Sequence, residues 1–298
     1  MLNIFNILKS TIPKFIKVKL RSNYNKIHDI MYGMKTTYHY NLYKNKYQYN
    51  TIYIVAGNRT ASTWLVEVLA TALDGYNIYR PINYPTGPGG VDYDIDIDII
   101  KRLDKKLHIV GSHTPAKQKN IELMDKYFKK YIVTIRDPKD VVVSLYFQIN
   151  KNPFGSAFMD FGLDRKLPWN TISPNDLNLN KKDFIDLLID RVMPGVVNIM
   201  LDWVNYSLYK NNILVIKYED LTTKPVIEIK KIMDFFKIDI EIKKIEETVN
   251  TLNPKNKNPK FKYFLTGKIG NWQEHLSSSQ IKDINNLSKE LLKKANYE

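Results

Sequence analysis

The sequence contains no cysteine. Disulfides, thiolate metal sites and thiol nucleophiles are therefore excluded, and an oxidising compartment has no support. The sequence also has no uninterrupted apolar run of about 18 residues, so no membrane-spanning helix is expected. Its first residues lack a long apolar core and a small-residue cleavage site, which argues against a signal peptide. We therefore expect a cytoplasmic protein.

Acidic residues are fewer than basic residues. There are 31 Asp and Glu against 45 Lys and Arg, which gives a formal charge of +14 at pH 7. This balance favours anionic partners such as nucleic acid, anionic lipid or a polyanionic small molecule, without choosing among them. The basic residues are scattered and no nucleic-acid-binding module is recognisable, so no nucleic acid is expected. Residues 1–22 are basic and weakly amphipathic, which would allow a weak contact with a membrane surface.

The chain is long enough for one large domain with a hydrophobic core. Few structural signals precede residue 51, so we assign residues 1–50 to a basic leader of uncertain structure and residues 51–298 to the domain.

Apolar runs rich in β-branched residues predict buried strands, and amphipathic runs predict helices. The predicted strands are residues 51–56, 107–112, 131–135 and 212–218, and the predicted helices are residues 63–73, 139–149 and 224–238. This order predicts an α/β fold with a central parallel sheet flanked by helices. Ligands of such folds lie at the carboxyl ends of the strands.

The segment 57–64, GNRTASTW, joins the first predicted strand to its helix. Small residues let the backbone approach phosphate oxygens, and a helix N-terminus offers unpaired N–H groups to an anion. Arg59 adds a permanent cation, and Thr60, Ser62 and Thr63 add hydroxyl donors. An ordinary N-capped loop explains the same residues equally well. The segment lacks the Gly-Lys pair of a Walker A motif, which disfavours a nucleoside-triphosphate kinase or ATPase.

A second candidate for phosphate binding follows the strand predicted at residues 131–135. Arg136 ends that strand, and Ser144 lies eight residues later, two turns into the next predicted helix. A guanidinium and a hydroxyl in these places could hold one phosphate from two sides. Considered alone, a surface arginine and a helical serine are the more ordinary interpretation.

His113 is one of five histidines and follows the strand predicted at residues 107–112. A neutral imidazole with a pKa of about 6.5 can take a proton from an acceptor hydroxyl at neutral pH. The alternative is a structural histidine at the end of a strand.

Together these segments resemble the PAPS-dependent sulfotransferases of the cytosolic type. Residues 58–64 align without gaps with the family's P-K-S-G-T-T-W loop, residues 136–144 resemble its 3'-phosphate motif, and residues 111–115 resemble its K-T-H-L-P segment. The resemblance implies a P-loop-like three-layer fold. It also implies the donor 3'-phosphoadenosine-5'-phosphosulfate (PAPS), the product PAP, and no metal. Arg59 stands where this family has Lys, and Ala61 where it has Gly.

The resemblance also implies a role for each matching residue. His113 would be the general base, and Arg59 with the loop N–H groups would stabilise charge on the leaving phosphate. Arg136 and Ser144 would bind the 3'-phosphate. The implied donor-binding residues are Arg59, Thr60, Ala61, Ser62, Thr63, Trp64, Arg136, Ser144, Tyr218, Gly267 and Lys268.

Two parts of the match are less specific. Trp64 and Tyr218 would lie at the adenine by resemblance, although a core tryptophan and an ordinary strand end are plausible alternatives. Residues 267–272, GKIGNW, resemble the family's C-terminal R-K-G-x-x-G-D-W motif but lack its Arg-Lys pair, for which Lys268 or Lys262 would have to substitute.

Other functions remain open. Four aspartates in Asp92–Asp98 would suit a metal-dependent glycosyltransferase, although their alternation with Tyr and Ile predicts a half-buried strand. The net charge would suit a non-catalytic polyanion-binding protein, and a catalytically lapsed relative is a third possibility. The acceptor, a small molecule, sugar or peptide, is not identified, and neither is the oligomeric state. We expect the long insertions at residues 81–98 and 150–180 to bind the acceptor.

Overall fold

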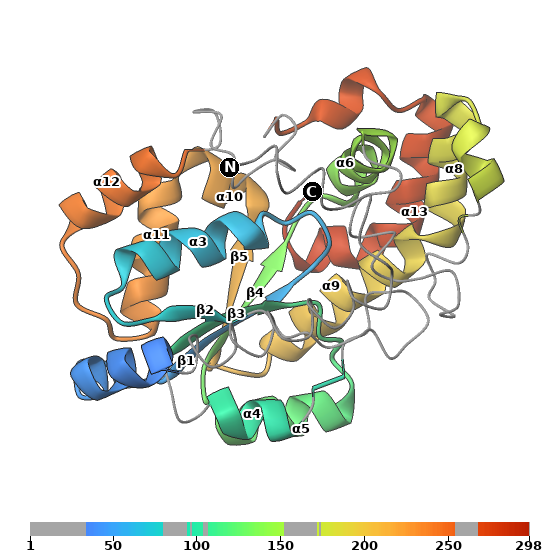
Figure 1. Cartoon of the computed structure of the whole chain (residues 1–298). Coiled ribbons are helices and arrows are strands. Elements are labelled where there is room, and N and C mark those ends of the chain that lie inside the picture. Colours follow the sequence, from blue (N-terminus) through green and yellow to red (C-terminus); the bar gives the residue numbers. More distant parts are fainter. Residues whose placement is uncertain are drawn as a thin grey trace, which may run out of the picture.

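The computed structural model describes residues 34–79, 94–95, 97–103, 107–151, 172, 174–253 and 268–297. At its centre is a parallel sheet of five strands in the order β2-β3-β1-β4-β5 (Figure 1). The strands are β1 (Thr51–Ala56), β2 (Asn77–Tyr79), β3 (His108–Ser112), β4 (Tyr131–Ile135) and β5 (Ile213–Lys217). Because all pairs are parallel, the carboxyl ends of the strands meet at one edge of the sheet.

Helices cover both faces of the sheet, which gives three layers. One face is covered by α3 (Ser62–Ala72), α11 (Pro225–Phe235) and α12 (Ile242–Thr251), and the other by α6 (Pro138–Lys151), α8 (Lys181–Arg191), α9 (Met193–Ser207) and α13 (Ser278–Lys294). Within β1, Ile52 and Ile54 belong to the core on the α3 side of the sheet, whereas Tyr53 and Val55 belong to the core on the α9 side. This alternation is the two-residue period of a strand buried on both faces.

Shorter helices complete the described part of the chain. They are α4 (Ile97–Leu103), α5 (Gln118–Tyr127), α10 (Tyr218–Thr223), η2 (Pro174–Asn178) and η5 (Asn271–Glu274). Within the described ranges, no helix has both the length and the apolar character needed to span a bilayer.

The α/β fold with a central parallel sheet is confirmed, and the strands predicted at residues 51–56 and 131–135 match to the residue. Two local predictions are wrong. Tyr218 is not the last residue of a strand but the first of α10, whose first turn carries Glu219 and Asp220, as helix N-termini favour. The acidic run does not continue as a half-buried strand, because residues 97–103 form α4 and bury Ile100 and Leu103 at helical spacing.

The described part of the leader packs against the domain. Residues 34–43 are helical, and the ring of Tyr43 lies on Gly75, just beyond α3. A Cβ atom on Gly75 would come within 2.4 Å of that ring, and Gly75 has a φ of +84°, which glycine adopts without strain. Beyond the helix, Lys46 Nζ lies 2.9 Å from Asp74 Oδ2, and the rings of Tyr47 and Tyr76 are 4.8 Å apart. These contacts fix the segment at the C-terminal end of α3.

The loop between β1 and α3 has a tightly constrained backbone. Gly57 N–H donates to the Thr134 carbonyl at 3.1 Å, and a Cβ on Gly57 would lie 2.8 Å from Met200 Cγ of α9. Arg59 and Ala61 have φ values of 63° and 61°, in the left-handed region that disfavours residues with a Cβ atom. Ala61 is the N-cap of α3 and makes no side-chain cap bond. The first N–H groups of α3 are therefore not capped by Ala61.

We expect Gly75→Ala to lower the free energy of unfolding by about 2 kcal/mol, because the new methyl group meets Tyr43 and the backbone conformation becomes strained. Gly195→Ala is the matched control, since no atom lies within 4 Å of a Cβ at this α9 position. The control should be neutral or stabilising by up to about 1 kcal/mol. Urea unfolding followed by circular dichroism measures both, and equal midpoints for the two variants would contradict the packing of Tyr43 on Gly75.

We expect Ala61→Gly to raise the free energy of unfolding by about 1 kcal/mol, because glycine removes the left-handed strain at the N-cap. Ala70→Gly, within α3, makes the same chemical change at a helical backbone and should lower the free energy of unfolding by about 1 kcal/mol. The opposite signs are the test, measured by urea unfolding. A loss of stability in both variants would show that residue 61 does not carry this strain.

Candidate active site

Four of the predicted site residues lie at the same edge of the sheet. Arg59 follows β1, His113 follows β3, Arg136 follows β4, and Tyr218 follows β5, each within three residues of the strand's carboxyl end. The strands β3, β1, β4 and β5 are consecutive neighbours in the sheet. The fold therefore gathers segments that are far apart in sequence at the position where ligands of open α/β sheets bind.

Arg59 contacts both residues of the second candidate phosphate-binding pair, Arg136 and Ser144. Its Nε donates to Ser144 Oγ at 2.9 Å, and its carbonyl oxygen accepts from Arg136 Nη1 at 3.1 Å. Burial, together with the nearby charge of Arg136, lowers the pKa of the Arg59 guanidinium to about 10. The group is still protonated at neutral pH. Two neighbouring cations therefore lie in this corner, and Arg59 links Arg136 to the Ser144 hydroxyl, in an arrangement that an anionic ligand would stabilise.

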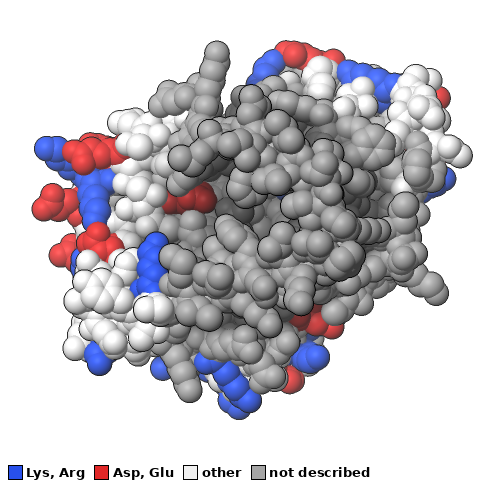
Figure 2. All heavy atoms as spheres, viewed as in Figure 1, with Lys and Arg blue, Asp and Glu red and all other residues white. Residues whose placement is uncertain are grey.

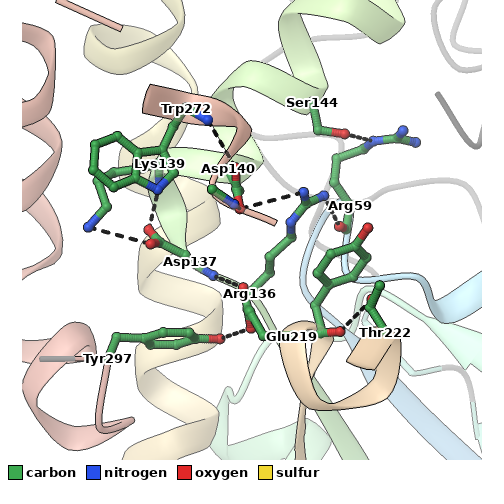
Figure 3. Close-up of polar contacts among 12 residues, drawn as sticks. Arg59, Arg136, Asp137, Lys139, Asp140, Ser144, Glu219, Thr222, Trp272 and Tyr297 are labelled. Atoms are coloured by element: carbon green, nitrogen blue, oxygen red, sulfur yellow. Dashed lines mark hydrogen bonds and ion pairs between the residues drawn. The ribbon is translucent and has the colours of Figure 1, made fainter. Parts of the chain in front are cut away.

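Arg136 is 6% exposed and is held from several sides. Its guanidinium lies 3.9 Å from the centre of the Tyr218 ring, and its Nη2 lies 3.9 Å from Asp140 Oδ2. Figure 3 shows it between Asp140 and the main chain of Arg59, with Ser144 on the far side of Arg59. Within the described ranges, Arg136 Nε is buried without a hydrogen-bond partner, and so is the Asn58 side-chain nitrogen. Buried donors are normally paired, so these two atoms fit a phosphate-bearing ligand.

Asp140 is a residue of this site that sequence reasoning missed. It is 1% exposed, and its two carboxylate oxygens accept from the backbone N–H of Gly270 at 2.8 Å and of Trp272 at 3.2 Å. It thereby ties residues 270–272 of the C-terminal motif to the helix that follows Arg136. The sequence signal is weak, because an aspartate in the first turn of a helix is common for electrostatic reasons alone.

A second carboxylate, in the first turn of α10, supports the same corner. Glu219 Oε1 accepts from the backbone N–H of Asp137 at 3.1 Å, and its Oε2 accepts from the Tyr297 hydroxyl at 2.8 Å (Figure 3). Burial raises the pKa of Glu219 and of Asp137. Lys139 Nζ lies 3.4 Å from Asp137 and 5.0 Å from the centre of the Trp272 ring. These contacts fix the start of α6, and with it the direction of Arg136.

His113 lies against the end of β1. Its Nδ1 is 2.7 Å from the Ala56 carbonyl oxygen, which can only accept, so Nδ1 carries the proton and the lone pair is on Nε2. Burial lowers the pKa of the His113 imidazole, which keeps the ring neutral at neutral pH. Its sequence neighbours Ser112 and Thr114 form, with Tyr53 of β1, a buried triangle of hydroxyl groups with oxygen separations of 2.6 to 2.9 Å. A neutral, fixed imidazole of this kind has the protonation state that a general base requires.

The loop hydroxyls differ in their use. Thr60 Oγ1 donates to the Gly57 carbonyl at 2.8 Å and lies 2.7 Å from Thr134 Oγ1, so this hydroxyl holds the loop together. Ser62 is partly exposed and Thr63 is exposed, both in the first turn of α3. Their position beside the helix N-terminus suits contact with an anion.

The two aromatic residues predicted at the adenine are almost fully buried. Trp64 is 6% exposed, its Nε1 donates to the Leu252 carbonyl at 2.9 Å, and it belongs to the core beside α12. Tyr218 is 3% exposed and stacks on Arg136. Both contacts are structural, and the predicted contacts with adenine stay predictions.

The C-terminal motif is described only from residue 268 onward. Gly267 and Lys262 lie outside the described residues. Lys268 forms an ion pair with Glu274. Gly270 takes the left-handed conformation, with a φ of 72°, before η5.

The acidic run does not produce a metal site in the described part of the chain. Asp94 accepts from Asn120 Nδ2 at 3.2 Å and lies 3.5 Å from Lys117 Nζ. Asp92 and Asp96 lie outside the described residues. Among the residues that can be described, no three histidine, aspartate or glutamate side chains come together in a way that would bind a metal ion.

Comparison with known proteins identifies the family. A family model described as the sulfotransferase domain matches residues 50–296. The curated protein Sulfotransferase 6B1 of Danio rerio is 27% identical over 168 residues, which cover 53% of this chain and 50% of that protein. The match thus spans half the length of this curated relative.

Two solved structures share the fold. Mouse sulfotransferase SULT7A1, complexed with PAP, superposes with a TM-score of 0.59 at 20% identity, over 82% of this chain and 85% of that chain. Retinol dehydratase, in complex with androsterone and inactive cofactor PAP, superposes with a TM-score of 0.55 at 15% identity, over 82% and 81%. At these identities the likeness is one of fold, while the family match extends over most of the sequence. The chain therefore belongs to the sulfotransferase family.

Proposed function

We propose that this chain transfers a sulfuryl group from PAPS to a hydroxyl or amine of an acceptor. The observation that supports this most is the corner where Arg59 contacts both Arg136 and Ser144 beside the N-terminus of α3. Two guanidinium groups, one hydroxyl and a helix N-terminus are the donor set that a phosphate-rich nucleotide requires. The family match supplies the reaction class.

In this proposal Arg136 and Ser144 hold the 3'-phosphate, and the unpaired Arg136 Nε donates to it. The N–H groups of Ser62 and Thr63 lie at the positive end of the α3 dipole and would bind the 5'-phosphosulfate. Arg59 contacts Ser144, so its guanidinium lies beside the predicted 3'-phosphate residues. Its second predicted role, at the leaving phosphate, stays a prediction.

The donor supplies the sulfuryl group, and the protein supplies position and charge. His113 would take the proton of the acceptor hydroxyl on Nε2, while the Ala56 carbonyl holds the opposite ring nitrogen. The cations and the helix N-terminus would stabilise the charge that grows on the leaving phosphate, each well-placed donor contributing about 3 kcal/mol. Binding at the 3'-phosphate, away from the chemistry, would orient the donor.

The acceptor is proposed to be a small molecule carrying a hydroxyl group. The structures of retinol dehydratase hold androsterone in one case and retinol in another. Both ligands are apolar alcohols, which supports this acceptor class over a sugar or a peptide. A cytoplasmic location is part of the proposal, since a chain without cysteine needs no oxidising compartment.

We expect calorimetry in EDTA to show PAP binding that depends on the 3'-phosphate, with ADP binding far more weakly. Arg136→Ala should weaken PAP binding by about 10- to 100-fold, because it removes a charge-assisted contact. Arg191→Ala, a half-exposed arginine of α8, is the matched control and should leave binding unchanged. Equal affinity for PAP and ADP would contradict the assigned 3'-phosphate site.

We expect the transfer rate to fall on acidification only below pH 6.5. Burial lowers the pKa of His113 from that ordinary value, and the imidazole stops acting as a base only when it becomes protonated. His113→Ala should reduce kcat/KM by about 100- to 10,000-fold. The assay is transfer of radiolabelled sulfate from PAPS to a phenol and a steroid alcohol. His275→Ala, a histidine that contacts Lys181 and Phe147, serves as the control. Full activity of His113→Ala would exclude the residue as the base.

A further inference from the structure

The helix at residues 34–43 packs against the domain by one face and exposes apolar side chains on the other. Its inner face carries Thr36, which is 1% exposed, and Tyr40 and Tyr43, which pack against the core beneath α3. These positions recur at intervals of four and three, which is the spacing of one helical face. The contacts of Tyr43 with Gly75 and of Lys46 with Asp74 fix this face on the domain.

The outer face of the same helix carries three exposed apolar side chains. Met34, Tyr38 and Leu42 are 69%, 64% and 57% exposed, and they recur at intervals of four. A helix on the surface of a globular domain normally turns polar side chains outward. Single exposed apolar residues are ordinary, but three in register on one face form a stripe that marks a contact surface.

The part of the sequence that contains this stripe has a strongly one-sided charge. Residues 1–50 contain nine Lys and Arg but one acidic residue, Asp29, a net charge of 9 − 1 = +8 out of +14 for the chain. Within residues 34–50, Lys35, Lys44 and Lys46 are the charged residues at neutral pH, and all three are basic. The first sixth of the sequence thus carries more than half of the net charge.

The stripe lies far from the donor site. The helix packs at the C-terminal end of α3, whereas Arg59 precedes its N-terminal end, and 11 residues of helix, about 16 Å, separate the two. Figure 1 shows the helix, in blue, at the outer edge of the molecule, away from α6 and α13. The corresponding region of Figure 2, at the lower left, is white and blue. A partner bound here would leave the catalytic edge of the sheet accessible.

We propose that this face of residues 34–43 rests on an anionic lipid surface. Its apolar stripe would enter the interface between headgroups and acyl chains, and the surrounding lysines would contact acidic headgroups, as in interfacial amphipathic helices. A second copy of the chain is a poorer partner, because a symmetric contact would bring Lys35 and Lys44 of both copies together with no acidic residue of 34–50 to pair with them. The inference concerns location and does not depend on the proposed reaction.

The test is sedimentation of the full chain with vesicles of phosphatidylcholine, with and without phosphatidylglycerol. We expect binding only to the anionic vesicles, weakened by high salt. The variant Met34→Ser/Tyr38→Ser/Leu42→Ser should bind at least about tenfold more weakly. Leu208→Ser/Tyr209→Ser removes two other exposed apolar residues, which are 59% and 84% exposed, and should bind like the unchanged chain.

A charge variant tests the same surface without altering its apolar groups. Lys35→Glu/Lys44→Glu should also weaken binding by at least about tenfold, and it decides the question if the serine variant does not fold. The proposal is overturned by absence of binding to anionic vesicles, or by equal binding of the unchanged chain and these variants. It is also overturned if light scattering without lipid shows a dimer that the serine variant abolishes, since a second copy would then occupy the face.

Discussion

The structure around the proposed donor site depends on keeping the positive charge of Arg136 buried and correctly directed. A buried cation is costly unless charges and hydrogen bonds surround it. Here the Tyr218 ring stacks on the guanidinium, the Arg59 carbonyl accepts one N–H, and Asp140 lies 3.9 Å away. Each of these partners comes from a different segment, so the corner exists only when β1, β4, α6 and α10 are all in place.

The sequence predicts the parts of the fold that have a strong local signal. Strands buried on both faces, such as residues 131–135, are continuous apolar runs, and the structure has them where they are expected. Helices with polar composition, such as α5 and α12, have no such run and were not predicted, although each buries a stripe on the sheet or on α3. The strand β2 has three residues, too few for a period to be recognised.

The same limit applies to the candidate site. Arg59, His113 and Arg136 could be found because they follow recognisable strands and match a known pattern. Asp140 could not be found in this way. Its partners are backbone N–H groups about 130 residues away in sequence, and backbone groups are not part of a residue pattern. Ala61 shows a different limit. The sequence shows that alanine stands where the family has glycine, but only the structure shows the left-handed backbone that makes alanine costly there.

The hydrogen bond from Tyr297 to Glu219 determines how late in synthesis this part of the fold can form. Glu219 directs the start of α6 through Asp137, and Asp140 on the same helix binds the segment at residues 270–272. Translation proceeds from the N-terminus, and domains generally fold as units. A nascent chain in which the loop at residues 57–61 and both arginines have already emerged still lacks residues 270–272 and Tyr297, which hold α6 and Glu219 in place. The proposed donor site can therefore be completed only after residue 297 has left the ribosomal exit tunnel.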